Sequence, residues 1–80
     1  MNTYETSFFC LCPVNNVRVC YRLTITTDAI IAVEELLAHI ARWYESGFHE
    51  LIADHLHEAF GGDQTLAADH HSVIITTRRS

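Results

Sequence analysis

Two short motifs in this sequence carry the side chains best suited to chemistry, and the first is Cys12-Pro13. It stands where a β-forming segment runs into a turn, so its thiol is accessible to a ligand. A nearby base or positive charge would activate such a thiol as a nucleophile. We take Cys12 as the candidate nucleophile, ahead of Cys10 and Cys20. The alternative is that Cys12 is a small buried apolar side chain, which is the commoner fate of a free cysteine.

The second motif is Phe48-His49-Glu50. If a helix is capped at Ser46, His49 and Glu50 lie in its first turn, where free backbone N–H groups keep a carboxylate ionised. Such a carboxylate accepts two hydrogen bonds from the amidine-like edge of a guanine or a pterin. Glu50 is therefore a candidate ring-binding residue. The alternative is a surface residue that complements the helix dipole.

The cysteines and histidines do not follow a metal-binding pattern. Structural zinc sites favour Cys-x-x-Cys pairs, whereas Cys10 and Cys12 are two apart and no second pair follows. Ala53 stands where the second histidine of a His-Glu-x-x-His helix would fall. Neighbours in a strand point to opposite faces, so His70 and His71 could not easily share a metal ion. We expect no metal, and the odd count of 3 cysteines argues against a disulfide framework.

The first part of the chain must place Cys12 at the end of a hairpin strand. Residues Thr3–Cys12 predict a strand, and Pro13–Asn16 predict the turn that follows it. Val17–Thr26 has the clearest pattern in the chain, because apolar and polar side chains alternate along it. The apolar row should face a core, and it consists of Val17, Val19, Tyr21, Leu23 and Ile25.

Two helices and a final β segment are expected after this hairpin. Thr26 or Thr27 caps the first helix, whose apolar stripe comprises Ile30, Val33, Leu36, Leu37, Ile40 and Tyr44. Ser46 caps the second helix and Gly61-Gly62 ends it, with an apolar side made of Phe48, Leu51, Ile52, His55, Leu56, Ala59 and Phe60. Gln64–Arg79 ends in the β-forming run Ser72–Thr77.

The predicted fold class is therefore α+β, with the order β-β-α-α-β and room for a fourth short strand. An antiparallel sheet would have both helices on one face. Its other face would still need a partner.

Length and composition limit what this chain can be. Its 80 residues fit a single domain spanning residues 1–80. The net charge is −5 and no basic cluster exists, so we expect neither a nucleic acid nor an anionic membrane as a partner. Apolar residues make up 49% of this small chain, so we expect a homo-oligomer. The start of the chain lacks a secretory pattern, so we expect a cytoplasmic protein.

Three features together resemble the tunnelling-fold (T-fold) superfamily, and most closely the QueF-type nitrile reductases of queuosine biosynthesis. They are Cys12-Pro13 at the end of a first strand, Phe48-His49-Glu50 at the start of a second helix, and Thr77-Arg78-Arg79 at the end of a last strand. The resemblance implies that Cys12 attacks the nitrile of 7-cyano-7-deazaguanine and forms a thioimide, which NADPH reduces in this class of oxidoreductase. It implies that Glu50 grips the purine edge and that His49 is the adjacent histidine of the site. It also implies a ring-shaped barrel of several copies with ligand sites between subunits.

The sequence departs from that family at two points. The stretch Val14–Val19, which follows Cys12-Pro13, lacks the aspartate that donates a proton in the family. Lysine, which is often useful for binding NADPH phosphates, is absent. Three alternatives stay open: an amidine-forming enzyme that uses ammonia on the thioimide, a pterin or folate-pathway T-fold enzyme, and a non-catalytic oligomeric binding module of the same fold.

Overall fold

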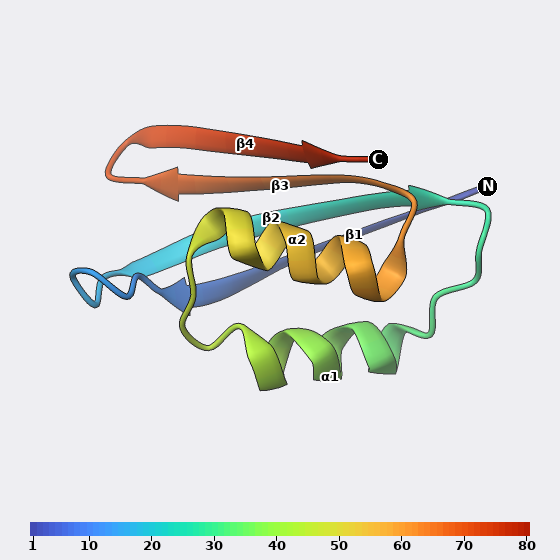
Figure 1. Cartoon of the computed structure of the whole chain (residues 1–80), viewed down its shortest axis with the longest axis horizontal. Coiled ribbons are helices and arrows are strands. Elements are labelled where there is room, and N and C mark those ends of the chain that lie inside the picture. The colour runs from blue at the N-terminus through green and yellow to red at the C-terminus, as the bar shows by residue number, and fades with distance from the viewer.

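Two antiparallel hairpins make up the sheet of this protein (Figure 1). In the computed structural model, which describes residues 1–80, β1 (Asn2–Leu11) pairs with β2 (Arg18–Thr27), and β3 (Asp63–His70) pairs with β4 (Val73–Arg79). β2 and β3 are also antiparallel neighbours, so the strand order is β1-β2-β3-β4. The predicted order is found with the fourth strand included, because the last segment of the chain folds as a hairpin rather than as one strand.

Both helices lie on one face of this sheet, as the sequence predicted (Figure 1). α1 (Val33–Trp43) and α2 (His49–Phe60) follow one another between β2 and β3. α2 packs over β3 and β4, whereas α1 lies beside it on the side of β1. An ion pair between Arg79 and Asp54, with Nε and Oδ1 2.8 Å apart, ties the end of β4 to α2.

The first helix begins later than the predicted cap at Thr26 or Thr27. Its N-cap residue is Ala32, and no side chain caps it. The Thr27 hydroxyl instead accepts a hydrogen bond from the Ala29 N–H, at 3.1 Å, which closes a local turn. The Ile31 N–H donates to the Tyr4 hydroxyl at 3.1 Å, and the Ile31 side chain is buried. Residues 28–32 therefore cross the end of the sheet as an extended connector, and the helix can start only after them.

The second helix begins at His49, with Phe48 as its N-cap residue, so the predicted cap at Ser46 is also wrong. Ser46 is engaged elsewhere, because it forms a parallel β-bridge with Leu11 and its hydroxyl donates to the Leu11 carbonyl at 3.3 Å. The prediction that His49 and Glu50 lie in the first turn of this helix is confirmed.

The apolar core fills the space between the helices and the sheet. The β2 row is buried as predicted, except for Val17, which is 40% exposed. Each helix buries a narrower face than its apolar pattern indicated. Core positions on the two helices are Leu36, Ile40, Ile52, Ala53 and Leu56, with Tyr44 at the end of α1. Predicted core positions that are exposed instead are Ile30, Val33, Leu37, Phe48, Leu51, His55 and Ala59. The two helices form a single layer on the sheet. Apolar side chains on the sides of these helices that face away from the sheet therefore have no neighbour within the chain.

One polar side chain, Gln64, is buried in this core, with 4% of its surface exposed. It lies just past the end of α2, where the last helical carbonyl groups have no partner within the helix. The Gln64 amide donates to the carbonyl oxygens of Leu56 and Gly61, at 3.0 and 2.8 Å. The side chain therefore acts as a C-terminal cap that holds α2 against the start of β3.

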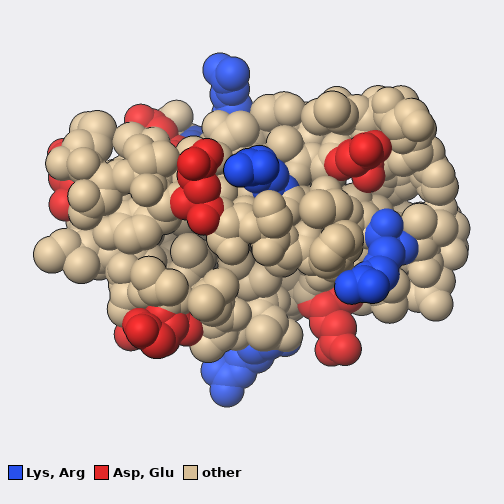
Figure 2. All heavy atoms as spheres, turned by 180° about the vertical axis from the view of Figure 1, so that it is seen from behind, with Lys and Arg blue, Asp and Glu red and all other residues tan.

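The face of the sheet opposite the helices is largely polar. Figure 2, which views the molecule from behind, shows acidic and basic side chains interspersed over this face without a patch of one sign. The strand register places on it Glu5, Ser7, Cys20, Arg22, Thr24, Thr65, Asp69, Thr76 and Arg78. Neither helix of the protein has the length and apolar character needed to cross a bilayer.

We predict that Gln64→Met lowers the free energy of unfolding by about 1–3 kcal/mol, because the carbonyl groups of Leu56 and Gly61 each lose the hydrogen bond from the Gln64 amide. Leu66→Met is the matched control, since Leu66 is buried on the same face of β3 and makes no side-chain hydrogen bond. That change should cost less than about 1.5 kcal/mol. Urea unfolding followed by far-UV circular dichroism measures both. Equal losses for the two variants would contradict the capping role of Gln64.

Candidate functional site

The backbone of Leu11 holds the connector between the two helices at the end of β1. The Leu11 N–H donates to the Glu45 carbonyl at 3.1 Å, and the Leu11 carbonyl accepts from the Gly47 N–H at 3.4 Å. These bonds extend the sheet by one short parallel bridge at its outer edge. They place the N-terminus of α2 next to the residue that follows Leu11, which is Cys12.

A cavity of about 160 Å³ opens at this point. It lies where the β1–β2 turn, the start of α2 and the β3–β4 hairpin meet. Cys12 and His49, two of the three predicted site residues, both line it. The full lining consists of Cys12, Pro13, Tyr21, Gly47, Phe48, His49, His70 and Ile75.

His49 is held in a defined protonation and orientation. Its Nε2 lies 3.0 Å from the Leu66 carbonyl oxygen, and because a carbonyl only accepts, Nε2 carries the proton. The other ring nitrogen, Nδ1, is buried and has no hydrogen-bond partner. Burial lowers the pKa of His49, with further lowering by the charges of Arg79 and His70, against the raising effects of the Leu66 hydrogen bond and Glu50. His49 is therefore a neutral base at physiological pH, with an unused lone pair on Nδ1.

Tyr21 lines the cavity, and its ring packs against the ring of His49. Its ring stacks on Phe8 at a centroid distance of 5.3 Å and lies tilted against the His49 ring, also at 5.3 Å. Burial, with smaller contributions from Cys10 and Cys12, raises the pKa of the Tyr21 hydroxyl to about 12. Tyr21 therefore stays protonated and serves as a rigid aromatic wall.

The three thiols lie in three different environments. Cys10 is buried in the core, and this burial raises its pKa to about 11, so it is an inert packing residue. Cys20 is exposed on the open face of the sheet. Only Cys12 combines partial exposure with a place in the cavity beside His49. The structure is consistent with the choice of Cys12 over the other two cysteines.

Glu50, the third predicted site residue, lies outside this cavity. It is in the first turn of α2 and its side chain is exposed. It lines neither this cavity nor the four other cavities formed by the residues around the helices and the sheet. A role for Glu50 in gripping a ring therefore needs a surface supplied from outside this chain, and that role stays a prediction.

His70 is the site residue that sequence reasoning missed. In the sequence, the pair His70-His71 suggests a metal pair or a pH sensor, and no group of three or more histidine, cysteine or acidic side chains is arranged to hold a metal ion. Alternation along β3 carries the helix-covered face through Leu66 and Ala68 to His70. This alternation could have identified His70 from the sequence, because it places His70 on the helix-covered face of the sheet, near Cys12, and separates it from His71.

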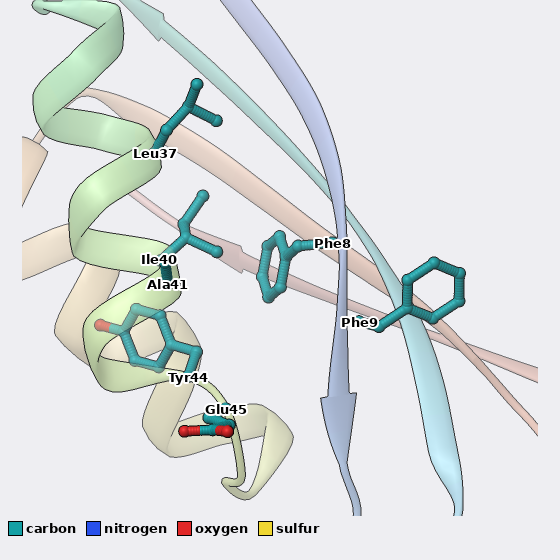
Figure 3. Close-up of a pocket in the computed structure, with 7 residues that line it drawn as sticks. All are labelled: Phe8, Phe9, Leu37, Ile40, Ala41, Tyr44 and Glu45. Atoms are coloured by element: carbon teal, nitrogen blue, oxygen red, sulfur yellow. The ribbon is translucent and has the colours of Figure 1, made fainter.

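A second cavity, of about 380 Å³, lies between β1 and α1 and is larger but chemically plain. Figure 3 shows Phe8 pointing toward α1 and Phe9 pointing away from it on the other side of β1. The lining is apolar apart from Glu45. This cavity offers no nucleophile or base, so it is an unfilled groove of the core rather than a reactive site.

Comparison of this chain with protein-family models, with curated proteins and with solved structures gives no match. The chemistry of the site is therefore argued from its own residues.

His39, like His49, has a pKa that the folded structure lowers. His39 lies on α1, its Nε2 is 3.1 Å from the Tyr44 hydroxyl, and its ring packs edge-on against Phe60 at 5.3 Å. Burial lowers the pKa of His39, and the charges of His55 and Arg42 lower it further. The folded protein therefore resists protonation at His39 and His49, whereas the unfolded chain does not.

We predict that the free energy of unfolding falls as the pH decreases from about 7.5 to 5.5. Both histidines have a folded-state pKa below the ordinary value of 6.5, so the unfolded state binds more protons in this range and stability rises with pH. The slope is limited to about 1.4 kcal/mol per pH unit for each histidine. Urea unfolding across this range should give a smaller slope for the double variant His39→Gln/His49→Gln. The exposed His71→Gln is the control, and equal slopes for all three proteins would contradict the prediction.

Proposed function

We propose that this chain is an oligomeric T-fold-like protein that binds a deazapurine, purine or pterin ring at a subunit interface. We further propose that Cys12 adds to a nitrile carbon carried by that ring. The observation that carries the proposal is the meeting of Cys12 and His49 in one small cavity, although they come from distant parts of the chain. The T-fold resemblance assigns these two residues to one active site, and the folded chain is compatible with that assignment.

The addition needs a base for the thiol and a proton for the nitrile nitrogen. We propose that His49 Nδ1, which has a free lone pair and makes no hydrogen bond within the chain, accepts the proton from the Cys12 sulfur when the ligand is bound. The sulfur then forms a bond to the nitrile carbon, and one of the two π bonds of the C≡N group breaks. The nitrogen takes up a proton, which leaves a thioimide on Cys12. The step moves protons and one electron pair but involves no oxidation or reduction.

The cavity is too small to bind a whole ring ligand alone. Its volume of about 160 Å³ lies below the roughly 300–1,000 Å³ of ordinary ligand clefts. Its rim includes Phe48, which is 52% exposed, and Glu50 stands exposed in the adjoining turn of α2. A second copy of the chain placed against this rim would enclose the ring between Phe48 and Glu50. This supports a site that is completed between subunits.

The sheet has features that suit such an assembly. β4 is an edge strand, and β1 is one up to Leu11, where the helix–helix connector pairs with it. Unpaired edges readily take up a strand from another chain. Pairing of β1 in one copy with β4 in the next would continue the sheet around a ring and cover its open face. Large apolar side chains are exposed at both ends of the strand order, including Phe9, Val73, Ile74 and Ile75.

The cavity does not fit the phosphate groups of NADPH. None of its lining side chains is a lysine or an arginine, and the chain contains no lysine at all. The proposed reaction therefore ends at the thioimide. Ammonia would convert the thioimide to an amidine without any nicotinamide, which is the amidine-forming alternative. A binding module without chemistry is the other alternative, and it keeps the ring site and the assembly.

We predict that incubation with 7-cyano-7-deazaguanine adds the mass of one nitrile molecule to Cys12, because the addition loses no atom. Intact-protein and peptide mass spectrometry measure the adduct. Cys12→Ser should abolish it, and Cys20→Ser, the matched control, should retain it. Glu50→Gln should weaken the non-covalent affinity at least tenfold, since loss of one partner of a charge-assisted pair costs about 2–5 kcal/mol. Non-covalent binding without an adduct would favour the binding module, and no binding at all would overturn the proposed function.

We predict a homo-oligomer larger than a dimer at low micromolar concentration. Two open sheet edges on each copy allow continued pairing, whereas one self-complementary edge would stop at a dimer. Sedimentation velocity at two concentrations measures the assembly. A single 9.1 kDa species at both concentrations would contradict this prediction.

A further inference from the structure

The β3–β4 hairpin adopts a strained turn next to the Cys12 cavity. Its two turn residues, His71 and Ser72, have φ values of 54° and 70°, and neither is a glycine. Such left-handed residues cost roughly 1–3 kcal/mol each and persist only where the surroundings enforce them. Here the Asp69 carboxylate accepts a hydrogen bond from the Ser72 N–H at 3.1 Å. The Asn15 side-chain amide donates to His71 Nε2 at 3.4 Å.

The Asp69–Ser72 bond closes the hairpin turn itself, and the Asn15–His71 bond joins this turn to the β1–β2 turn. His70, the last residue of β3, therefore lies near the turn that starts at Cys12. His70 lines the same cavity as Cys12 and His49, and its ring packs edge-on against His71 at 5.1 Å. None of the side-chain hydrogen bonds of the protein involves His70, and the side chain is half-buried. A ring N–H of His70 is thus free for a ligand.

We propose that His70 is the general acid of the Cys12 cavity. It donates a proton to the atom that gains an electron pair when the Cys12 sulfur attacks an electrophile. For a nitrile this atom is the nitrile nitrogen, and in that case the inference rests on the proposed function. The Cys12 proton passes to His49 Nδ1, the His70 imidazolium gives its proton to the nitrogen, and His70 ends neutral while His49 ends protonated. Protons and charge balance without any further reactant.

The other groups of the cavity are poorer donors than His70. The Tyr21 hydroxyl holds its proton tightly, since burial raises its pKa to about 12. The Nε2 proton of His49 is committed to the Leu66 carbonyl. His49 could return only the Nδ1 proton that it takes from the thiol, and the His70→Gln variant distinguishes that route from donation by His70. No carboxylate lines the cavity. His70 is therefore the side chain of the cavity best placed to donate a proton.

Two electrophiles of similar size test this role without relying on a nitrile. Iodoacetamide releases iodide, which needs no proton, whereas glycidamide opens an epoxide whose oxygen must be protonated. The ratio of the two alkylation rates at Cys12, mapped by peptide mass spectrometry, reports proton donation alone. Any change in the accessibility or nucleophilicity of Cys12 affects both rates and cancels in the ratio.

In the wild type, the glycidamide-to-iodoacetamide ratio should be higher at Cys12 than at the exposed Cys20. His70→Gln should lower the ratio at Cys12 at least tenfold, since general acids contribute about 10²–10⁴-fold. His55→Gln, which changes an exposed histidine of α2 that does not line the cavity, should leave the ratio unchanged. Cys20 is an internal reference in every sample.

The outcomes separate this inference from the proposed function. A wild-type ratio at Cys12 no higher than at Cys20, or a ratio unchanged by His70→Gln, overturns the role of His70. Formation of the nitrile adduct in that case leaves the proposed function standing. Absence of the adduct together with a His70-dependent ratio overturns nitrile addition and retains His70 as the proton donor of a reactive-thiol site.

Discussion

The pairing of Leu11 with the helix–helix connector is the constraint on which the site depends. Leu11 is the last residue of β1, and its N–H and carbonyl are both bonded to residues 45–47. This short bridge decides where α2 begins, and the start of α2 decides where His49 stands. Without it, Cys12 would follow a free edge strand, and His49 would lie on a helix that is not held at the same cavity.

A second constraint is the boundary between the apolar core and the solvent at this end of the sheet. Burial at the cavity lowers the pKa of His49 and raises that of Tyr21, whereas His70 stays half-exposed. Acid and base roles in proteins are assigned by such differences in environment. Here two histidines in one cavity differ because the proton of one is committed to a backbone carbonyl, whereas the ring of the other is free.

The errors in the sequence predictions share one physical origin. Ser46 has a good capping side chain but is drawn into a β-bridge, and Thr27 closes a turn instead of starting a helix. A capping residue can serve several local structures, and long-range pairing decides which of them forms. Leu37 and Leu51 fit apolar stripes and are nevertheless exposed, because periodicity identifies the apolar side of a helix but not how much of it finds a neighbour.

The sequence by itself determined the class of fold, the buried row of β2 and the first turn of α2. These follow from local rules of alternation, turn chemistry and helix periodicity. The tertiary structure alone decided the starts of both helices, the capping role of Gln64, the orphaned lone pair of His49 and the arrival of His70 at the site. Each of these depends on contacts between residues far apart in the chain, and no local pattern specifies which distant backbone group a side chain will meet.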